Sequence, residues 1–200
     1  MAKPPKRSSW NKETLRLKGN HGWKCKPGYR IFVADRGAVR FDFPDDWVVR
    51  PSEDGTILMH DREPPDDDVR LALTVLYLRD DVDWSALKIP ALLKEITSRG
   101  KDGQDRGYGP IVEVAGRRGQ ELAWSETSFP DAESGRPITS RTALARYSNI
   151  QIVLTLDFWA DLSPRFGTVR DEILRTIILG DYVEDPTQRV EADPLDDLFA

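Results

Sequence analysis

The chain has very few of the residues that form covalent cross-links and metal centres. Among its 200 residues there are one cysteine, Cys25, and two histidines, His21 and His60. A single cysteine excludes an internal disulfide. A structural zinc site needs about four cysteine or histidine ligands. Although His21 and Cys25 lie close together in the chain, these residue types are too scarce, and the sequence predicts no metal site and no cofactor.

Long hydrophobic runs are also missing. The longest apolar stretches, such as residues 150–156, are far shorter than the roughly 20 residues that a membrane helix requires. The basic start of the chain is not followed by the apolar segment of a secretory signal. With 32% charged residues and a mean hydropathy of -0.52, the sequence predicts a soluble, cytoplasmic protein with no membrane partner.

Charge is unevenly distributed along the chain. The net charge is -5, but residues 1–34 carry nine Lys or Arg and one acid, and residues 182–200 carry six acids and one arginine. Charge-biased ends of this kind are usually solvated or serve as interaction segments. We therefore predict a basic flexible arm (1–20), a single folded domain (21–183) and an acidic disordered tail (184–200).

The apolar pattern of the middle segment predicts both strands and helices. Alternating apolar residues and short turn signals predict strands within 29–43, 47–60, 69–78, 111–129 and 138–159. Helical spacing predicts one helix from Pro90 to Gly100 and another from an N-cap at Ser163 to Gly180. Because the strands are joined by hairpin-length connections, we expect an α+β fold with a mainly antiparallel sheet flanked by helices.

Residues 41–47, which read FDFPDDW, raise the question of whether Asp45 and Asp46 form a chemical or metal site or belong to the scaffold. The two phenylalanines alternate with Asp42 and should point to one sheet face. The proline should end the strand, and the tryptophan should fold back onto the core. Aspartate suits the exposed turn between them because its side chain bonds to nearby backbone groups. We interpret the segment as scaffold.

This segment resembles the F-x-F-P-x-x-W motif of the PsbP-like sandwich proteins. The order of elements is similar from about Tyr29 to Tyr182, including Gly119 and Glu121 before a hairpin and a closing helix after Ser163. The resemblance implies the α/β/α sandwich shared by the extrinsic photosystem II protein, a Ran-binding nuclear import factor and bacterial proteins, some of them effector-loading chaperones of type VI secretion. The family has no common catalytic residues, so the resemblance assigns none here.

Motifs for nucleophilic catalysis and phosphate binding are not found. The chain has no Gly-x-Ser-x-Gly elbow and no glycine loop ending in GK[ST]. Cys25 stands between Lys24 and Lys26, which favour the thiolate, but no pocket is expected around it. An enzyme with a cleft between sheet and helix remains an alternative.

Two groups of acidic residues are candidate metal or catalytic sites. The Asp66–Asp68 run lacks the glycine and the distal glutamate of a calcium loop, which favours a solvated acidic loop. Glu113, Glu121 and Glu126 fall on predicted strands and could pair as acid and base, but carboxylates on a sheet are more often surface residues. Neither group predicts catalysis.

The two ends carry the strongest binding signals. Basic residues of the arm are interleaved with Trp10 and Trp23, a pattern that suits phosphates and stacked bases, and those proposed to bind anions are Lys3, Lys6, Arg7, Lys12, Arg16 and Lys18. The alternative for the arm is a solubilising segment, or one that folds back on the acidic body of the chain.

The tail sets large apolar residues among acids, as in short peptides that dock into grooves, and its candidate anchors are Leu195, Leu198 and Phe199. The alternatives for the tail are a frayed end and a segment that packs on its own domain. The leading hypothesis is a non-catalytic, cytoplasmic domain of adaptor, chaperone or assembly-factor type that binds another protein and recruits it with its ends. Nucleic-acid or anionic-surface binding through the basic arm is the second hypothesis.

Overall fold

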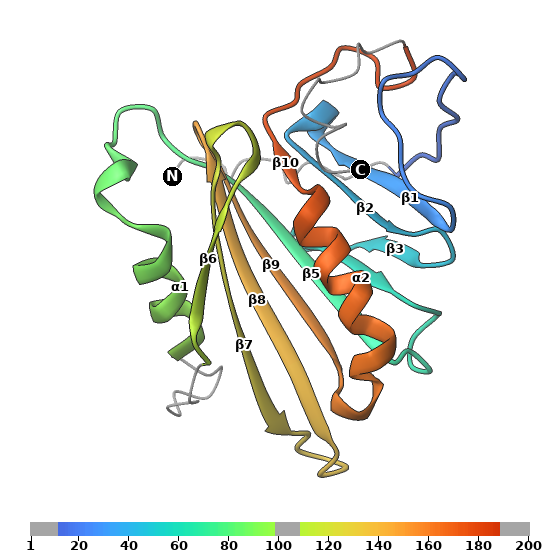
Figure 1. Ribbon diagram of the computed structural model, residues 1–200, viewed down its shortest axis with the longest axis vertical. Coiled ribbons are helices and arrows are strands. Elements are labelled where there is room, and N and C mark those ends of the chain that lie inside the picture. Colours follow the sequence, from blue (N-terminus) through green and yellow to red (C-terminus); the bar gives the residue numbers. More distant parts are fainter. Residues whose placement is uncertain (1–11, 99–108, 189–200) are drawn as a thin grey trace, which may run out of the picture.

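The computed structural model describes residues 12–98 and 109–188 (Figure 1). The described helices are α1 (Ile89–Ser98) and α2 (Ser163–Thr176). The strands are β1 (Tyr29–Ala34), β2 (Val39–Pro44), β3 (Val48–Pro51), β4 (Ile57–His60), β5 (Val69–Tyr77), β6 (Ile111–Ala115), β7 (Glu121–Pro130), β8 (Pro137–Tyr147), β9 (Ile150–Trp159) and β10 (Ile178–Leu179). This content and order confirm the α+β prediction.

The strands form two antiparallel sheets, whereas the sequence predicted one. The large sheet has the order β3-β4-β5-β9-β8-β7-β6, and the small sheet has the order β1-β2-β10. The β1–β2 hairpin separates from the large sheet at Pro44, where Trp47 N–H donates to the Pro44 carbonyl in a tight turn. Since both sheets have an apolar face, the small sheet buries its own by packing against the large one.

Helices cover the two faces of the large sheet unequally. Helix α2 lies on the same side as the small sheet and contacts β2 and β9, and α1 packs on the opposite side against β6, β7 and β8 (Figure 1). On α1, Ile89 and Leu93 are buried against Ala123 and Leu144. The layers are therefore helix, sheet and a mixed layer of helix and small sheet.

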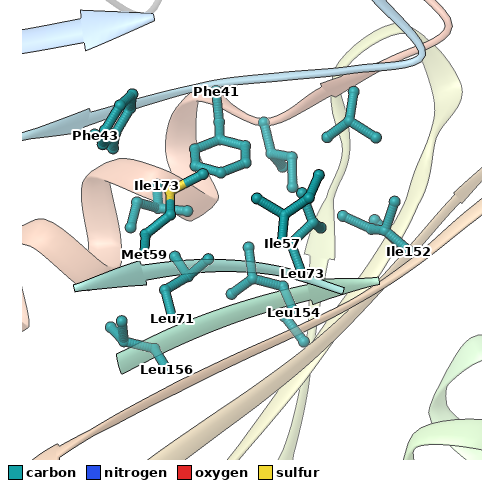
Figure 2. Close-up of a cluster of buried hydrophobic side chains, with 14 of the residues drawn as sticks. Phe41, Phe43, Ile57, Met59, Leu71, Leu73, Ile152, Leu154, Leu156 and Ile173 are labelled. Atoms are coloured by element: carbon teal, nitrogen blue, oxygen red, sulfur yellow. The ribbon is translucent and has the colours of Figure 1, made fainter. Parts of the chain in front are cut away.

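The main core lies between the two sheets and α2 (Figure 2). Phe41 has no exposed surface and packs against the partly buried Phe32, with 4.9 Å between ring centroids. Phe43 and Trp47 are each 3% exposed, while Asp45 and Asp46 are exposed. The scaffold interpretation of FDFPDDW is confirmed for these two aspartates.

The closing helix is shorter than predicted. It ends at Thr176 because Ile177 is extended, and Ile178 and Leu179 then pair with β2 as β10. The side chain of Gln120 fixes this change, since its amide donates to the Ile177 carbonyl (2.9 Å) and its oxygen accepts from Leu179 N–H (3.2 Å). At the other end Ser163 lies inside the helix, and Leu162 takes the N-cap position.

Candidate functional site: the turn surface

Three turns and one extended segment meet at one end of the molecule. The turns are η1 (Asp35–Gly37) between β1 and β2, η3 (Arg117–Gly119) between β6 and β7, and Ser148–Asn149 between β8 and β9. The segment 180–182 follows β10. We call the surface that they form, together with the neighbouring end of β5, the turn surface. It lies at the upper end of Figure 1.

Asp181 joins the turns of the two sheets. Arg118 Nη1 in η3 lies 2.8 Å from Asp181 Oδ1, and Arg40 Nη2 in β2 lies 3.2 Å from Asp181 Oδ2. Next to it, Val183 N–H donates to the carbonyl of Arg36 in η1 (2.9 Å). The turn surface is therefore held as one unit even though its turns belong to different sheets.

Gly37 shows how closely these parts approach. Its φ is +103°, and a Cβ at this position would lie 2.0 Å from the carbonyl oxygen of Asp181. Only glycine adopts this positive φ readily and also avoids the clash between a Cβ and the Asp181 carbonyl. Gly37 is thus the point of contact between η1 and the segment 180–182.

Backbone strain is concentrated on this surface. Four described residues other than glycine have positive φ, and all of them belong to its turns: Asp35 (45°), Arg36 (56°), Arg118 (53°) and Ser148 (52°). The left-handed conformation costs a residue with a Cβ roughly 1–2 kcal/mol. Clustered strain of this kind is typical of functional sites.

Large apolar side chains are exposed around the same turns. Tyr182 is 58% exposed and Tyr77 is 51% exposed, and Leu76 and Val82 also reach solvent. Tyr77 Oη donates to Asp35 Oδ2 at 2.5 Å, which ties the end of β5 to η1. Partial burial, the hydrogen bond and charge of Asp35, and the neighbouring Tyr182 all raise the pKa of Tyr77, so it stays a neutral donor.

A hollow of about 500 Å³ opens beside η3. Its lining includes Arg146, which is 5% exposed and donates to the Trp84 carbonyl (2.8 Å) and to Glu121 Oε2 (2.8 Å). The hollow is lined by Arg79, Asp80, Val82, Asp83, Trp84, Ser85, Gly119, Glu121, Arg146, Tyr147, Ser148 and Asn149. A second hollow of about 670 Å³ shares Gly119 and Glu121 with it and extends between α1 and β6.

The strand glutamates considered as an acid–base pair do not converge. Glu121 pairs with Arg146 on the side of the sheet that α1 covers. Glu126 lies on the opposite side and pairs with Arg141 (3.0 Å) and Arg170 (2.5 Å). Glu113 lines the second hollow, on the α1 side. Two of the three carboxylates are therefore engaged by arginines on different faces, an arrangement typical of structural ion pairs.

Asp42, inside the FDFPDDW segment, is an ionisable residue that the sequence interpretation missed. It is 6% exposed, and its N–H donates to Thr176 Oγ1 at the end of α2 (2.9 Å). Burial and then the Glu172 carboxylate raise the pKa of Asp42 to about 6, although Arg40, Arg175 and Arg117 oppose the shift. The alternating sequence of β2 does not predict that Asp42 is buried, because alternation does not show what packs against the polar face of the strand.

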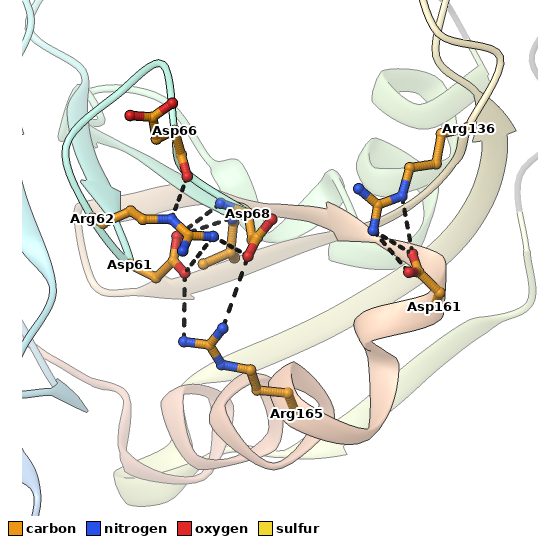
Figure 3. Close-up of polar contacts among 8 residues, drawn as sticks. Asp61, Arg62, Asp66, Asp68, Arg136, Asp161 and Arg165 are labelled. Carbon is orange, nitrogen blue, oxygen red and sulfur yellow. Dashed lines mark hydrogen bonds and ion pairs between the residues drawn. The ribbon is translucent and has the colours of Figure 1, made fainter.

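The acidic loop between β4 and β5 is neutralised from within the chain (Figure 3). Arg62 pairs with Asp68, and Arg165 of α2 reaches Asp61 (3.5 Å) and Asp68 (3.9 Å). Asp67 Oδ2 lies 2.8 Å from His60 Nδ1. Within residues 12–98 and 109–188 no group of three or more potential ligands could hold a metal ion.

We therefore expect neither calcium nor a chelator to change the thermal midpoint of the protein. Guanidinium groups already occupy the positions beside the loop carboxylates, so a cation has no ligand set to bind. Differential scanning fluorimetry with excess CaCl₂, with EDTA and with matched NaCl tests this. A calcium-specific rise in the midpoint would contradict it.

His21 and Cys25 do not form a joint site. His21 is 2% exposed, and its Nδ1 accepts a hydrogen bond from Trp23 N–H (2.9 Å). Cys25 is exposed, and its Sγ lies 3.0 Å from the Tyr29 carbonyl. Partial burial of the Cys25 thiol, followed by the charges of Asp42 and Asp45, raises its pKa. This is the reverse of the activation that the flanking lysines suggested.

Parts of both chain ends lie against the domain. Lys12 Nζ donates to the Val49 carbonyl at the edge of β3 (3.0 Å), and Lys18 Nζ donates to Gln188 Oε1 (2.9 Å). Arg16 is exposed. The other proposed end residues lie outside the described part of the chain: Lys3, Lys6, Arg7, Leu195, Leu198 and Phe199. The anion-binding and docking hypotheses for the ends stay predictions.

None of the described helices is long and apolar enough to cross a membrane.

The fold defines a class of proteins. A solution structure of cyanobacterial PsbP (CyanoP) from Synechocystis sp. superposes with a TM-score of 0.55 at 11% identity, covering 78% of this chain and 98% of that one. A crystal structure of a protein from Bacteroides thetaiotaomicron gives a TM-score of 0.54 at 16% identity. The match covers 76% of this chain and only 48% of the longer Bacteroides chain. The chain therefore has a PsbP-like fold, as its motif implied.

Sequence similarity gives the family. The family model described as Alr1449 matches residues 30–183, and the chain belongs to this family. A relative, the uncharacterized protein alr1449 of Nostoc sp., is 38% identical over 190 residues, covering 94% of this chain and 96% of the relative. The match extends beyond the family segment at both ends.

Proposed function

We propose that this protein is a non-catalytic, cytoplasmic protein-binding domain of adaptor, chaperone or assembly-factor type, and that it binds its partner through the turn surface. One observation carries the proposal. The exposed side chains of Tyr77, Val82 and Tyr182 lie on the same surface as the four turn residues with positive φ. Tyrosine and arginine are enriched among the residues that dominate binding energy at protein interfaces.

Physical features of this surface favour a macromolecular partner over a small substrate. The hollow is bounded by charged side chains that already pair, such as Arg146 with Glu121 and Arg79 with Asp81. Of the large exposed groups, Val82 lines the hollow, whereas Tyr77 and Tyr182 are not among its lining residues. A partner that covers the rim would bury these aromatic and aliphatic groups, which is the usual arrangement of an interface core.

The chain ends have a supporting role in this proposal. Leu195, Leu198 and Phe199 would act as a second, peptide-like contact, and the basic residues before Trp23 would assist with acidic partners. Because Lys12 and Lys18 already bond within the chain, anion binding by this segment would need these contacts to be exchanged. This supports protein binding ahead of the nucleic-acid alternative.

Site-specific photocrosslinking in the native host tests the proposed function. A photoreactive residue at position 182 should yield a discrete protein adduct, and the same residue at the control position Glu133, exposed in the turn at the other end of the β7–β8 hairpin, should not. Nuclease-sensitive adducts would favour the nucleic-acid alternative. The absence of adducts at 182, with the protein folded, would contradict the proposal.

A further inference from the structure

We propose that the acidic end of the chain (residues 189–200) docks on the basic segment of the same chain (residues 12–26), so that the two ends cover each other. The proposal goes beyond the turn surface and does not depend on it. It is carried by the place where the described part of the chain ends, by three lysines that bond only neutral oxygens, and by the charges that follow Gln188.

The basic segment is held against the domain. His21 N–H donates to the Lys18 carbonyl (3.0 Å), and the side chains of His21 and Trp23 are 2% and 4% exposed. The guanidinium of Arg40 in β2 lies over the Trp23 ring, 4.7 Å from its centroid. Because this backbone is already ordered, a second segment can bind to it with little further loss of conformational entropy.

Three exposed lysines of the basic segment bond neutral oxygens. Their Nζ atoms donate to the Val49 carbonyl from Lys12 (3.0 Å), to Gln188 Oε1 from Lys18 (2.9 Å) and to the Gly19 carbonyl from Lys24 (3.4 Å). An ammonium group has three donors. Each of these lysines can therefore bind a carboxylate as well, without giving up an existing ion pair.

Carboxylates do occur in and near the basic segment, namely Glu13, Asp42, Asp45, Glu172, Glu184 and Asp185. Among the described residues, however, none of them forms an ion pair with the three lysines. Glu172 pairs instead with Lys26 (3.3 Å), and Asp185 accepts from Thr187 Oγ1 (2.7 Å). The contact with charge that is missing at the three lysines must come from another segment.

The acidic end starts beside these lysines. Gln188, which bonds Lys18, is the last described residue, and the Lys24 ammonium lies next to it in space at Gly19. The twelve residues that follow carry one base, Arg189, and four acids, Glu191, Asp193, Asp196 and Asp197. They span at most about 40 Å when extended. A tethered segment this short is present at a high effective concentration around its attachment point.

An apolar contact would add to the charge pairing. Leu15 lies between Lys12 and Lys18 in the chain and is 49% exposed. The acidic end contains Leu195, Leu198 and Phe199, which are separated by acids and cannot be buried within so short a segment. Packing these groups on Leu15 would remove apolar surface from water. As a consequence, a polyanion must displace the acidic end before it reaches the lysines.

Zero-length carbodiimide cross-linking of the purified full-length protein, followed by mass spectrometry, tests the contact. We expect links from Glu191 or Asp193 to Lys18 or Lys24 that become fewer as salt screens the exposed charges. Lys88 and Lys94, exposed on α1 at the other side of the large sheet, are the matched controls and should form few such links. Links between isotopically labelled and unlabelled molecules would show that a second copy is bound instead.

Fluorescence anisotropy with a labelled DNA duplex, used as a probe of uncovered lysines, tests the consequence. Replacing the four acids at 191, 193, 196 and 197 by their amides should raise the affinity about tenfold, the effect of losing about two exposed ion pairs. The control variant has the same net charge, with amides at the exposed loop and turn residues Glu53, Asp66, Asp80 and Glu133. It should change the affinity by less than about twofold.

The two measurements together decide the proposal. If both amide variants bind the duplex equally well, net charge alone explains the gain and the acidic end does not cover the lysines. If cross-links reach Lys88 and Lys94 as often as Lys18 and Lys24, or join separate molecules, the basic segment is not a docking site within its own chain. Each of these results overturns the proposal, and none of them bears on protein binding by the turn surface.

Discussion

Phe41→Ala is expected to lower the free energy of unfolding by about 4 kcal/mol, the usual effect of truncating a fully buried phenylalanine. Phe41 has no exposed surface, contacts the Phe32 ring and lies between the two sheets among Met59, Leu73 and Ile173 (Figure 2). Because both sheets and α2 meet around the ring, the site cannot collapse to fill the cavity. Urea unfolding followed by tryptophan fluorescence and by circular dichroism measures the loss.

The neighbouring aspartates provide the matched control for this prediction. Asp45→Ala and Asp46→Ala alter the same FDFPDDW segment at exposed positions and should change stability by no more than about 0.5 kcal/mol. An aspartate variant as destabilising as Phe41→Ala would show that the turn, rather than the aromatic face, determines the role of the segment.

Asp42→Asn is expected to stabilise the protein at neutral pH by about 2–3 kcal/mol and to flatten its pH dependence. The folded pKa of Asp42 is about 6, above the ordinary 3.8. The native state therefore binds the proton more tightly than the unfolded chain does. The stability that the protonated Asp42 contributes is fully present below pH 3.8 and is lost as pH rises through about 6. An amide at this position stays neutral throughout.

Equilibrium urea unfolding between about pH 5 and pH 7.5 checks this. Glu172 acts in the opposite direction and at lower pH, because its hydrogen bond with Arg175 lowers its pKa below 4.5 and its contribution is lost only as pH falls through that lowered value. The exposed Asp45→Asn serves as the control and should follow the parent protein. A slope in Asp42→Asn equal to that of the parent would show that Asp42 does not ionise as described.

Much of the fold could be predicted from the sequence alone, because the signals for strands, turns and helices come from residues that are close together in the chain. Alternation placed strands within 29–43, 69–78 and 138–159, and the outer limits of these segments lie within a residue of those of β1, β2, β5, β8 and β9, since period-two patterns directly report which face is buried. The FDFPDDW motif identified both its own packing and the PsbP-like class. The helix that begins after Leu162 was found too, but its end was not. Ile177 and Ile178 fit a helical stripe and an extended edge equally well.

The candidate site was much less predictable. The turns at 35–37 and 117–119 lie about 80 residues apart in a chain whose sheet order the sequence did not predict, and arginine carries no signal of positive φ. Asp42 and Thr176, bonded across 134 positions, were equally invisible. The charge bias of the two ends marks them as candidate binding segments. Composition does not reveal, however, that Lys18 lies beside Gln188.

The sequence by itself determined the α+β class, the strand positions, the family motif and the uneven charge, because each follows from residues near one another in the chain. Only the tertiary structure decided that the hairpin of β1 and β2 forms a separate sheet, that β10 completes it, and that η1, η3 and the β8–β9 turn share one surface. The physical reason is that sheet order and layer packing are fixed by the mutual burial of faces distant in sequence. Local periodicity shows that each face is apolar without showing which other face covers it.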